Sequence, residues 1–212
     1  MSRPNPTLLY HFTHIGHLGS VAAKGLLSDT HAAESGLITT EIGQPGIKYQ
    51  RRCRPVPCGA GGMASDYVPF YYATRSPMLY AIPRSRAASY TEGQDPLVYL
   101  VTTVEQLLAL DLGPVFTDRN AALAITQFTA TLGDLDDLVD WDLMRATMWA
   151  NTPEDPDRRE RRMAECLVNR RVPWEAFIKI LTISQDRRRQ VETILSGFGI
   201  NIPVRSHPEA YF

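Results

Sequence analysis

The sequence predicts an α+β protein, because short strand-like runs and helical runs alternate along it without a regular repeat. Several runs are rich in aromatic and β-branched residues, as is typical of strands. They span 7–12, 67–72, 96–103, 114–117, 164–170, 177–183 and 199–205. The spacing between these runs is uneven, and no clean βαβ unit can be identified. This favours an α+β arrangement over a doubly wound parallel sheet.

Helical segments follow several of the strand-like runs. Residues 13–25 carry apolar side chains at helical spacing, with Thr13 as a plausible N-cap and Gly25 as a stop. Ser76 and Pro77 begin another helix, with serine at the N-cap and proline at the first helical position. Further helices are predicted at 104–110, 120–132 and 185–197.

Two regions do not follow this alternation. Residues 35–66 form a long irregular stretch with at most one short helix, near 47–53, and loops of that length are usually functional or disordered. The acidic, tryptophan-containing segment 133–157 is predicted to be an excursion from the core. Because neither a repeat nor a flexible linker interrupts the chain, we expect a single domain over 1–212.

The composition is that of a soluble globular protein, with 44% hydrophobic residues, 21% charged residues and a formal net charge of −1. This near-neutral charge argues against a protein that coats nucleic acid or membrane non-specifically. A local basic site remains possible, because the charges occur in blocks.

Three cysteines provide no disulfide framework, and no second ligand pair completes a zinc site, so no metal is expected. The N-terminus lacks an apolar signal core, and no apolar run reaches the length of a membrane span. We therefore expect a reduced, cytoplasmic location.

Five distinctive segments occur in order along the chain: YHFTHIGHL (10–18), IKYQRR (47–52), DYVPFYYATRSPMLYAI (66–82), VFTDRNAAL (115–123) and RRMAECLV (161–168). Within the third, the block VPFYYATRSPMLY is long and unusual in composition. Together these segments resemble the DarT family of bacterial DNA ADP-ribosyltransferase toxins, and the resemblance extends from about Leu8 to Pro173.

This resemblance implies an ADP-ribosyltransferase-like fold, with a split, mostly antiparallel sheet and peripheral helices around an NAD cleft. It implies transfer of ADP-ribose from NAD to a base in single-stranded DNA, with a thymine ring nitrogen favoured. Guanine, RNA or protein as acceptor, or a decayed nucleic-acid-binding module, are the alternatives. The implied partners of this expected monomer are single-stranded DNA and a macrodomain antitoxin, DarG.

Glu165 follows an arginine cluster and opens an apolar strand-like run. Cleavage of the nicotinamide–ribose bond develops positive charge on the sugar, and a rigid carboxylate can stabilise that charge. The residue could instead be a strand-edge glutamate paired with Arg161 or Arg162. The resemblance places it on the family's catalytic glutamate.

The expected cofactor contacts come from His11, Thr13, Arg51, Tyr71 and Met78. Strand alternation puts His11 and Thr13 on one face, where they could bind ribose hydroxyls, although His11 could simply bond a backbone carbonyl. The resemblance makes Arg51 a second catalytic residue with an electrostatic role, since a charged guanidinium is a poor base. Its neighbour Arg52 makes that assignment ambiguous by one residue. Tyr71 and Tyr72 are expected on opposite faces of a strand, so that one could stack on the cofactor and the other pack in the core, and the resemblance favours Tyr71 for the cofactor. Met78 could equally belong to the core.

The expected DNA contacts precede or flank these residues. Trp149 and the arginines before Glu165 suit unstacked bases and phosphates. The alternative is that Trp141 and Trp149 are core residues and that 158–162 is a solvated basic run. Asn120 stands where some relatives carry histidine, which leaves the preferred base open. The expected DNA-binding set is Arg75, Arg119, Asn120, Trp149, Arg158 and Arg162.

Overall fold

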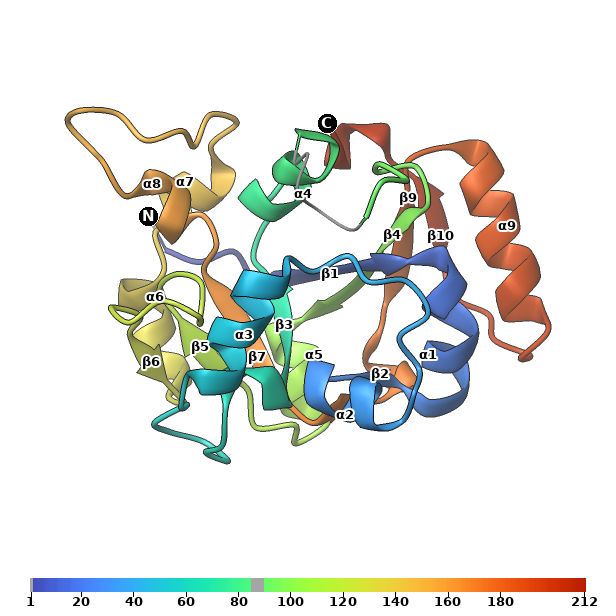
Figure 1. Ribbon diagram of the computed structural model, residues 1–212, viewed down its shortest axis with the longest axis horizontal. Helices are drawn as coiled ribbons and strands as arrows, with labels where there is room; N and C mark the ends of the chain where they lie inside the picture. Colours follow the sequence, from blue (N-terminus) through green and yellow to red (C-terminus); the bar gives the residue numbers. More distant parts are fainter. Residues whose placement is uncertain (1, 85–89) are drawn as a thin grey trace.

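A computed structural model describes residues 2–84 and 90–212, and this part of the chain folds around an eight-stranded sheet (Figure 1). The strand order is β10-β9-β4-β1-β3-β7-β5-β6, and every neighbouring pair is antiparallel except β9 with β10. The predicted α+β class with a mostly antiparallel sheet is thus confirmed. The strands are β1 (Leu8–His14), β3 (Tyr67–Tyr71), β4 (Leu97–Thr103), β5 (Val115–Thr117), β6 (Phe128–Thr129), β7 (Glu165–Asn169), β9 (Lys179–Thr182) and β10 (Val204–Ser206).

The sheet is split between β1 and β3. Strand β1 pairs with β4 along its whole length, and β3 pairs with β7 from Tyr67 to Tyr71. Between these two halves, β1 and β3 share only the pair Tyr10 and Tyr71. The two strands therefore diverge on either side of one point, which leaves backbone groups and side chains at their edges free for other contacts.

Both faces of the sheet are buried. One face, which includes Leu9, Phe70 and Leu100, packs against helices from both ends of the molecule. The other face, which includes Phe12 and Tyr99, packs against α4 and the C-terminal residues. A small second sheet pairs β2 (Leu26–Leu27) with β8 (Arg171–Val172).

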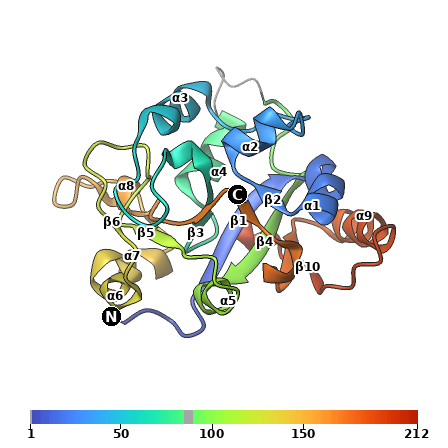
Figure 2. The ribbon, with the colours of Figure 1, turned by 90° about the horizontal axis from the view of Figure 1, so that it is seen from below.

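The helices cover the edges of the sheet. Helices α1 and α9 pack together at one end, and α6, α7 and α8 lie at the other (Figure 1). Figure 2 shows α6 beside the N-terminal segment, where the Arg3 backbone N–H donates to Asp136. The helices are α1 (Leu18–Lys24), α2 (Asp29–Glu34), α3 (Pro45–Cys53), α4 (Pro77–Ala81), α5 (Val104–Ala109), α6 (Leu135–Leu138), α7 (Trp141–Arg145), α8 (Arg158–Arg161) and α9 (Gln185–Ser196).

The first predicted helix begins later than the periodicity suggested. Strand β1 runs through Thr13 to His14, and a 3₁₀ turn precedes α1. Thr13 is therefore not the N-cap; the His14 side chain accepts the Gly16 N–H instead. Gly25 does end the helix, with a φ of 80° that favours glycine.

The predicted helix over 120–132 is wrong, because this segment forms turns followed by β6. The Asn120 side chain accepts the Ala122 N–H, and its carbonyl accepts the Thr126 hydroxyl. These local bonds compete with helical ones, as short polar side chains often do.

Segment 133–157 was also predicted wrongly as an excursion from the core. Leu135, Trp141 and Leu143 are at most 3% exposed and belong to the main core. The aspartates of this segment flank short helices. In the sequence they obscure the helical spacing of the apolar residues. In the part of the chain that the structure describes, no helix is long and apolar enough to cross a bilayer.

Candidate active site

A cavity of about 360 Å³ lies where the two halves of the sheet diverge. Its walls come from β1, β3, the segment 37–48, α3 and α4. Seven of the predicted site residues line it: His11, Thr13, Arg51, Tyr71, Met78, Asn120 and Glu165. His11 and Glu165, which are 154 positions apart in the sequence, thus line the same cavity.

Glu165 is the first residue of β7 and is 1% exposed. Its backbone N–H donates to the Thr117 hydroxyl at 3.0 Å, and its carbonyl accepts the Tyr72 hydroxyl at 3.3 Å. Its side chain accepts the Ala121 N–H at 3.1 Å. Glu165 is consequently held by hydrogen bonds at both its backbone and its carboxylate.

Arg51 on α3 supplies the charge that balances this carboxylate. Its Nη1 donates to both oxygens of Glu165, at 3.1 and 2.9 Å, and its Nη2 donates to the Ala64 carbonyl at 3.2 Å. Arg52 points elsewhere and pairs with Asp29 at 3.3 Å. The structure therefore places Arg51, and not its neighbour, beside Glu165.

His11 lies at the divergent edge of β1, where its Nδ1 is 2.8 Å from the Pro69 carbonyl of β3. Because a carbonyl only accepts, Nδ1 carries the proton and Nε2 presents a lone pair. Burial lowers the pKa of His11 to about 4, and the bond to Pro69 only partly offsets this. The ring is neutral at pH 7 and acts there as a hydrogen-bonding group.

His17 lines the same cavity and was not among the predicted site residues. Its Nε2 accepts the Thr40 backbone N–H at 3.2 Å, so Nδ1 carries the proton and donates to the Thr13 hydroxyl at 3.0 Å. Burial lowers its pKa, which favours this neutral form. The side chain thus ties the irregular segment around Thr40 to β1.

Lys48 was not predicted but also lines the cavity. It pairs with Asp29 at 2.5 Å and with Glu41. These contacts join α2, α3 and the intervening segment into one wall. No motif in the sequence identifies them, because the three residues follow no recognisable spacing and are individually ordinary.

Tyr71 lies directly opposite Glu165 across β3 and β7. Its ring stacks on Phe12 with centroids 6.5 Å apart, and its hydroxyl donates to the Met78 sulfur at 3.6 Å. Burial, and then the charge of Glu165, raise the pKa of Tyr71 well above its ordinary value. The residue therefore offers an aromatic wall and a protonated hydroxyl, and it cannot act as a base at neutral pH.

Asn120 and one further residue, Arg159, also reach the cavity. Asn120 lines it, although its amide oxygen already accepts the Ala122 N–H. Arg159 on α8 lines it as well, and was not among the predicted site residues. The sequence placed it within the basic run but gave no reason to prefer it over its neighbours.

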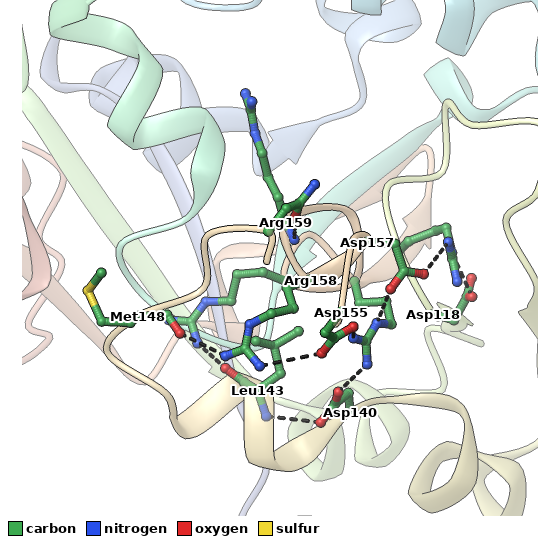
Figure 3. Close-up of polar contacts among 12 residues, drawn as sticks. Asp118, Asp140, Leu143, Met148, Asp155, Asp157, Arg158 and Arg159 are labelled. Carbon is green, nitrogen blue, oxygen red and sulfur yellow. Dashed lines mark hydrogen bonds and ion pairs between the residues drawn. The ribbon is translucent and has the colours of Figure 1, made fainter. Parts of the chain in front are cut away.

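The structure does not bring the other predicted DNA contacts into the cavity. Arg75 lies 4.5 Å from the centre of the Phe212 ring, and Trp149 packs edge-on against Tyr80. Arg119 and Arg158 both pair with aspartates (Figure 3).

Arg162 is only 6% exposed and donates to the carbonyls of Leu143, Met144, Ala146 and Thr74. As a buried support for the end of α7, its guanidinium is not available to DNA. Among the described residues, no group of three or more His, Cys, Asp or Glu side chains could hold a metal ion.

Comparisons with known proteins agree with this geometry. A family model described as "DarT: ssDNA thymidine ADP-ribosyltransferase" matches residues 10–212. A DNA ADP-ribosyl transferase of Thermus sp. (strain 2.9) is 38% identical over 195 residues, which cover 92% of this chain and 90% of that protein.

Solved structures of Thermus sp. 2.9 DarT superpose closely on this chain. The complex with ADP-ribosylated single-stranded DNA has a TM-score of 0.91 at 35% identity and covers 100% of this chain and 99% of the other. The complex with NAD⁺ has a TM-score of 0.87 at 34% identity and covers 100% of both chains.

Proposed function

The chain belongs to the DarT family of NAD-dependent DNA ADP-ribosyltransferases, and we propose that it transfers ADP-ribose from NAD to a thymine ring nitrogen in single-stranded DNA. Thermus sp. 2.9 DarT has been solved in complex with NAD⁺ and in complex with ADP-ribosylated single-stranded DNA. The observation that supports the same chemistry here is the buried carboxylate of Glu165, held by Arg51 and the Ala121 N–H at the cavity.

The reaction breaks the bond between nicotinamide and C1′ of the ribose, and nicotinamide leaves with the bonding electron pair. Positive charge then develops on the sugar, as in glycoside hydrolysis. A carboxylate fixed beforehand stabilises that charge without reorganising. The ring nitrogen of the base forms the new bond to C1′ and releases its proton.

The remaining residues of the cavity suit the donor. His11 presents a neutral Nε2 and Thr13 a hydroxyl, which match ribose hydroxyls. Tyr71 and Met78 provide an apolar wall for the nicotinamide ring. Arg51 is already bound to Glu165 and Ala64, so its role is to hold the carboxylate rather than to remove a proton.

For the acceptor strand we propose Asn120 beside the reacting base. The rings of Tyr80, Trp149 and Phe212 form an edge-to-face cluster, with Arg75 over Phe212. Such aromatic and cationic groups suit the stacking of flanking bases. Arg119 and Arg158 affect DNA binding only indirectly, because aspartates pair with their guanidinium groups.

We also propose that the whole of 1–212 works as one monomeric domain, that it acts in the cytoplasm, where NAD and DNA are both present, and that a macrodomain antitoxin of the DarG type opposes it. Family membership supports this partner. The cavity itself supports only the transferase reaction.

A mass measurement on defined oligonucleotides tests the proposal. With NAD, we expect one ADP-ribosyl addition to a single strand that contains thymine and none to a matched strand without it. Addition to the thymine-free strand would overturn thymine as the acceptor, and no addition to any strand by the folded protein would overturn the transferase activity.

The matched pair Glu165→Gln and Glu192→Gln then tests the carboxylate. Both changes remove one charge, but Glu192 pairs with Arg188 on the outer face of α9. We expect only Glu165→Gln to lose activity, by a factor of at least about 10². Equal activity of the two variants would contradict the assignment of Glu165.

A further inference from the structure

The segment between α7 and α8, residues 146–157, has no regular secondary structure and little apolar anchorage. Met148, Thr152 and Glu154 are exposed, and Trp149 is the main side chain that packs against the core. A segment of this kind depends on polar contacts for a defined position. Because it leads directly into the cavity residue Arg159, its position matters for the acceptor side.

One guanidinium binds three aspartates in and beside this segment. Arg161 donates from Nε to Asp157 at 2.8 Å, from Nη1 to Asp140 at 2.5 Å, and from Nη2 to Asp155. The three aspartates come from the start of α7, from the irregular segment and from the start of α8 (Figure 3). All three nitrogens of a planar fork are thus used to hold three separate pieces of chain together.

The same aspartates connect this network to the turn after β5, which holds Glu165. Asp155 also pairs with Arg158 at 3.4 Å, and Asp157 also pairs with Arg119 at 3.2 Å. Arg119 directly follows β5 and Asp118, and two residues later the Ala121 N–H binds Glu165. The segment is therefore fastened to the turn that fixes the catalytic carboxylate.

Arg159 differs from the arginines around it. Its side chain extends away from the network in Figure 3 and lines the cavity. Its backbone N–H donates to Asn151, but among the described residues its guanidinium has no ion pair or hydrogen bond. Arg158 and Arg161 are neutralised by aspartates, and Arg162 is buried, so Arg159 alone brings positive charge from this run to the cavity.

We propose that Arg161 is a positioning residue for the acceptor strand: by binding Asp140, Asp155 and Asp157 together, it sets the segment 146–160 so that Arg159 meets a DNA phosphate at the mouth of the cavity. This inference rests on the proposed function. It assigns the contact to Arg159 and the placement of that contact to Arg161.

The energetics favour a local effect over a global one. The Arg161 side chain is 24% exposed, and single ion pairs of this kind contribute little to global stability. We expect Arg161→Lys to lower the melting temperature by no more than roughly 2–4 °C. Loosening the segment is therefore expected to affect the DNA contact much more than the fold.

The test uses the full chain with Arg159→Gln, Arg161→Lys and the double variant, assayed by transfer to one thymine-containing oligonucleotide. Lysine keeps the charge of Arg161 but cannot bind three carboxylates in a plane. We expect both single variants to raise the KM for the oligonucleotide roughly tenfold and to lower the salt slope of its logarithm by about 0.7, as loss of one phosphate contact to a single strand requires. The dissociation constant for NAD should not change in Arg161→Lys.

The double variant distinguishes positioning from an independent contact. If Arg161 acts through Arg159, the double variant has the same KM as Arg159→Gln alone. Multiplied effects of the two changes, or a weaker affinity for NAD in Arg161→Lys, would overturn the proposal. The control Arg188→Lys breaks a comparable geometry at the Glu192 pair on α9 and should leave every value unchanged.

Asp155→Asn provides a second variant that removes one arm of the network while keeping its shape. It should raise the same KM by a smaller factor and also lose that effect in the Arg159→Gln background. If wild-type protein modifies the oligonucleotide but none of these variants changes its KM, Arg161 is not a positioning residue. If wild-type protein fails to modify any strand, the proposed function itself fails.

Discussion

Arg51 and Glu165 lie 114 positions apart in the chain and form an ion pair of 2.9 Å at the cavity. Their side chains are only 11% and 2% exposed. Each charge is therefore far from bulk water, and each depends on the other. We expect both the fold and the proposed reaction to require the pair.

Removing one partner alone should be costly for stability. Arg51→Met leaves the Glu165 carboxylate buried without its counter-charge, which typically costs about 3–5 kcal/mol. We expect equilibrium urea unfolding to show this loss, and we expect the double variant Arg51→Met with Glu165→Met to recover a large part of it. Neither variant should transfer ADP-ribose. A double variant less stable than the single one would contradict this account of the pair.

The partly buried His11 should make stability depend on pH. Its pKa is about 4 in the folded chain and near 6.5 when unfolded, so the unfolded chain binds more protons between these values. Stability is then highest above pH 6.5 and falls by about 3 kcal/mol as the pH drops to 4. His11→Gln should flatten this part of the profile.

The control for this profile is the exposed His207, whose side chain is 54% accessible. Melting curves of His207→Gln should retain the wild-type slope between pH 6.5 and 4. A wild-type slope in His11→Gln as well would show that His11 is not the group responsible.

Tyr71 should matter for its ring rather than its hydroxyl. Because the raised pKa keeps the hydroxyl protonated, Tyr71→Phe loses only the 3.6 Å contact to the Met78 sulfur, and we expect the KM for NAD to change less than about threefold. Tyr71→Ala removes the aromatic wall and should raise this KM by a factor of roughly 10 or more. Initial rates at varied NAD provide the measurement, and a severe loss in Tyr71→Phe would point to a chemical role for the hydroxyl.

His17 should hold the wall formed by the segment around Thr40. His17→Ala removes the acceptor of the Thr40 N–H and the donor to Thr13. Each such bond contributes about 1 kcal/mol, so we expect faster proteolysis within 35–44 and roughly a tenfold higher KM for NAD. Bound NAD should restore protection, and equal cleavage rates in wild type and variant would contradict this role. His31→Ala, at a histidine of α2, is the matched control.

Much of the fold followed from local patterns. The strands around Leu9, Tyr99 and Leu167 are long apolar runs bounded by turn residues, and the sequence predicted them closely. The helix over 120–132 failed because Asn120, Thr126 and Asp118 bond to nearby backbone groups, which no apolar periodicity reveals.

The site was predicted less evenly. Motif similarity indicated Glu165 and Arg51, and the structure removes the ambiguity with Arg52. Motif similarity could not distinguish the four arginines that precede Glu165. The burial of Arg162, the ion pairs of Arg158 and Arg161, and the exposure of Arg159 are decided by tertiary contacts. The same applies to His17, whose two bonding partners are visible only once the irregular segment is placed.

The single shared pair between Tyr10 and Tyr71 has a wider consequence. The two halves of the sheet carry different parts of the donor site, with His11 on one and Glu165 on the other. A dinucleotide that binds both halves would link them. Its binding would therefore stabilise the folded protein, by about 2.7 kcal/mol when the free dinucleotide is at a hundredfold excess over its dissociation constant. The free energy of unfolding of this protein would then depend on the NAD concentration in the cell that contains it.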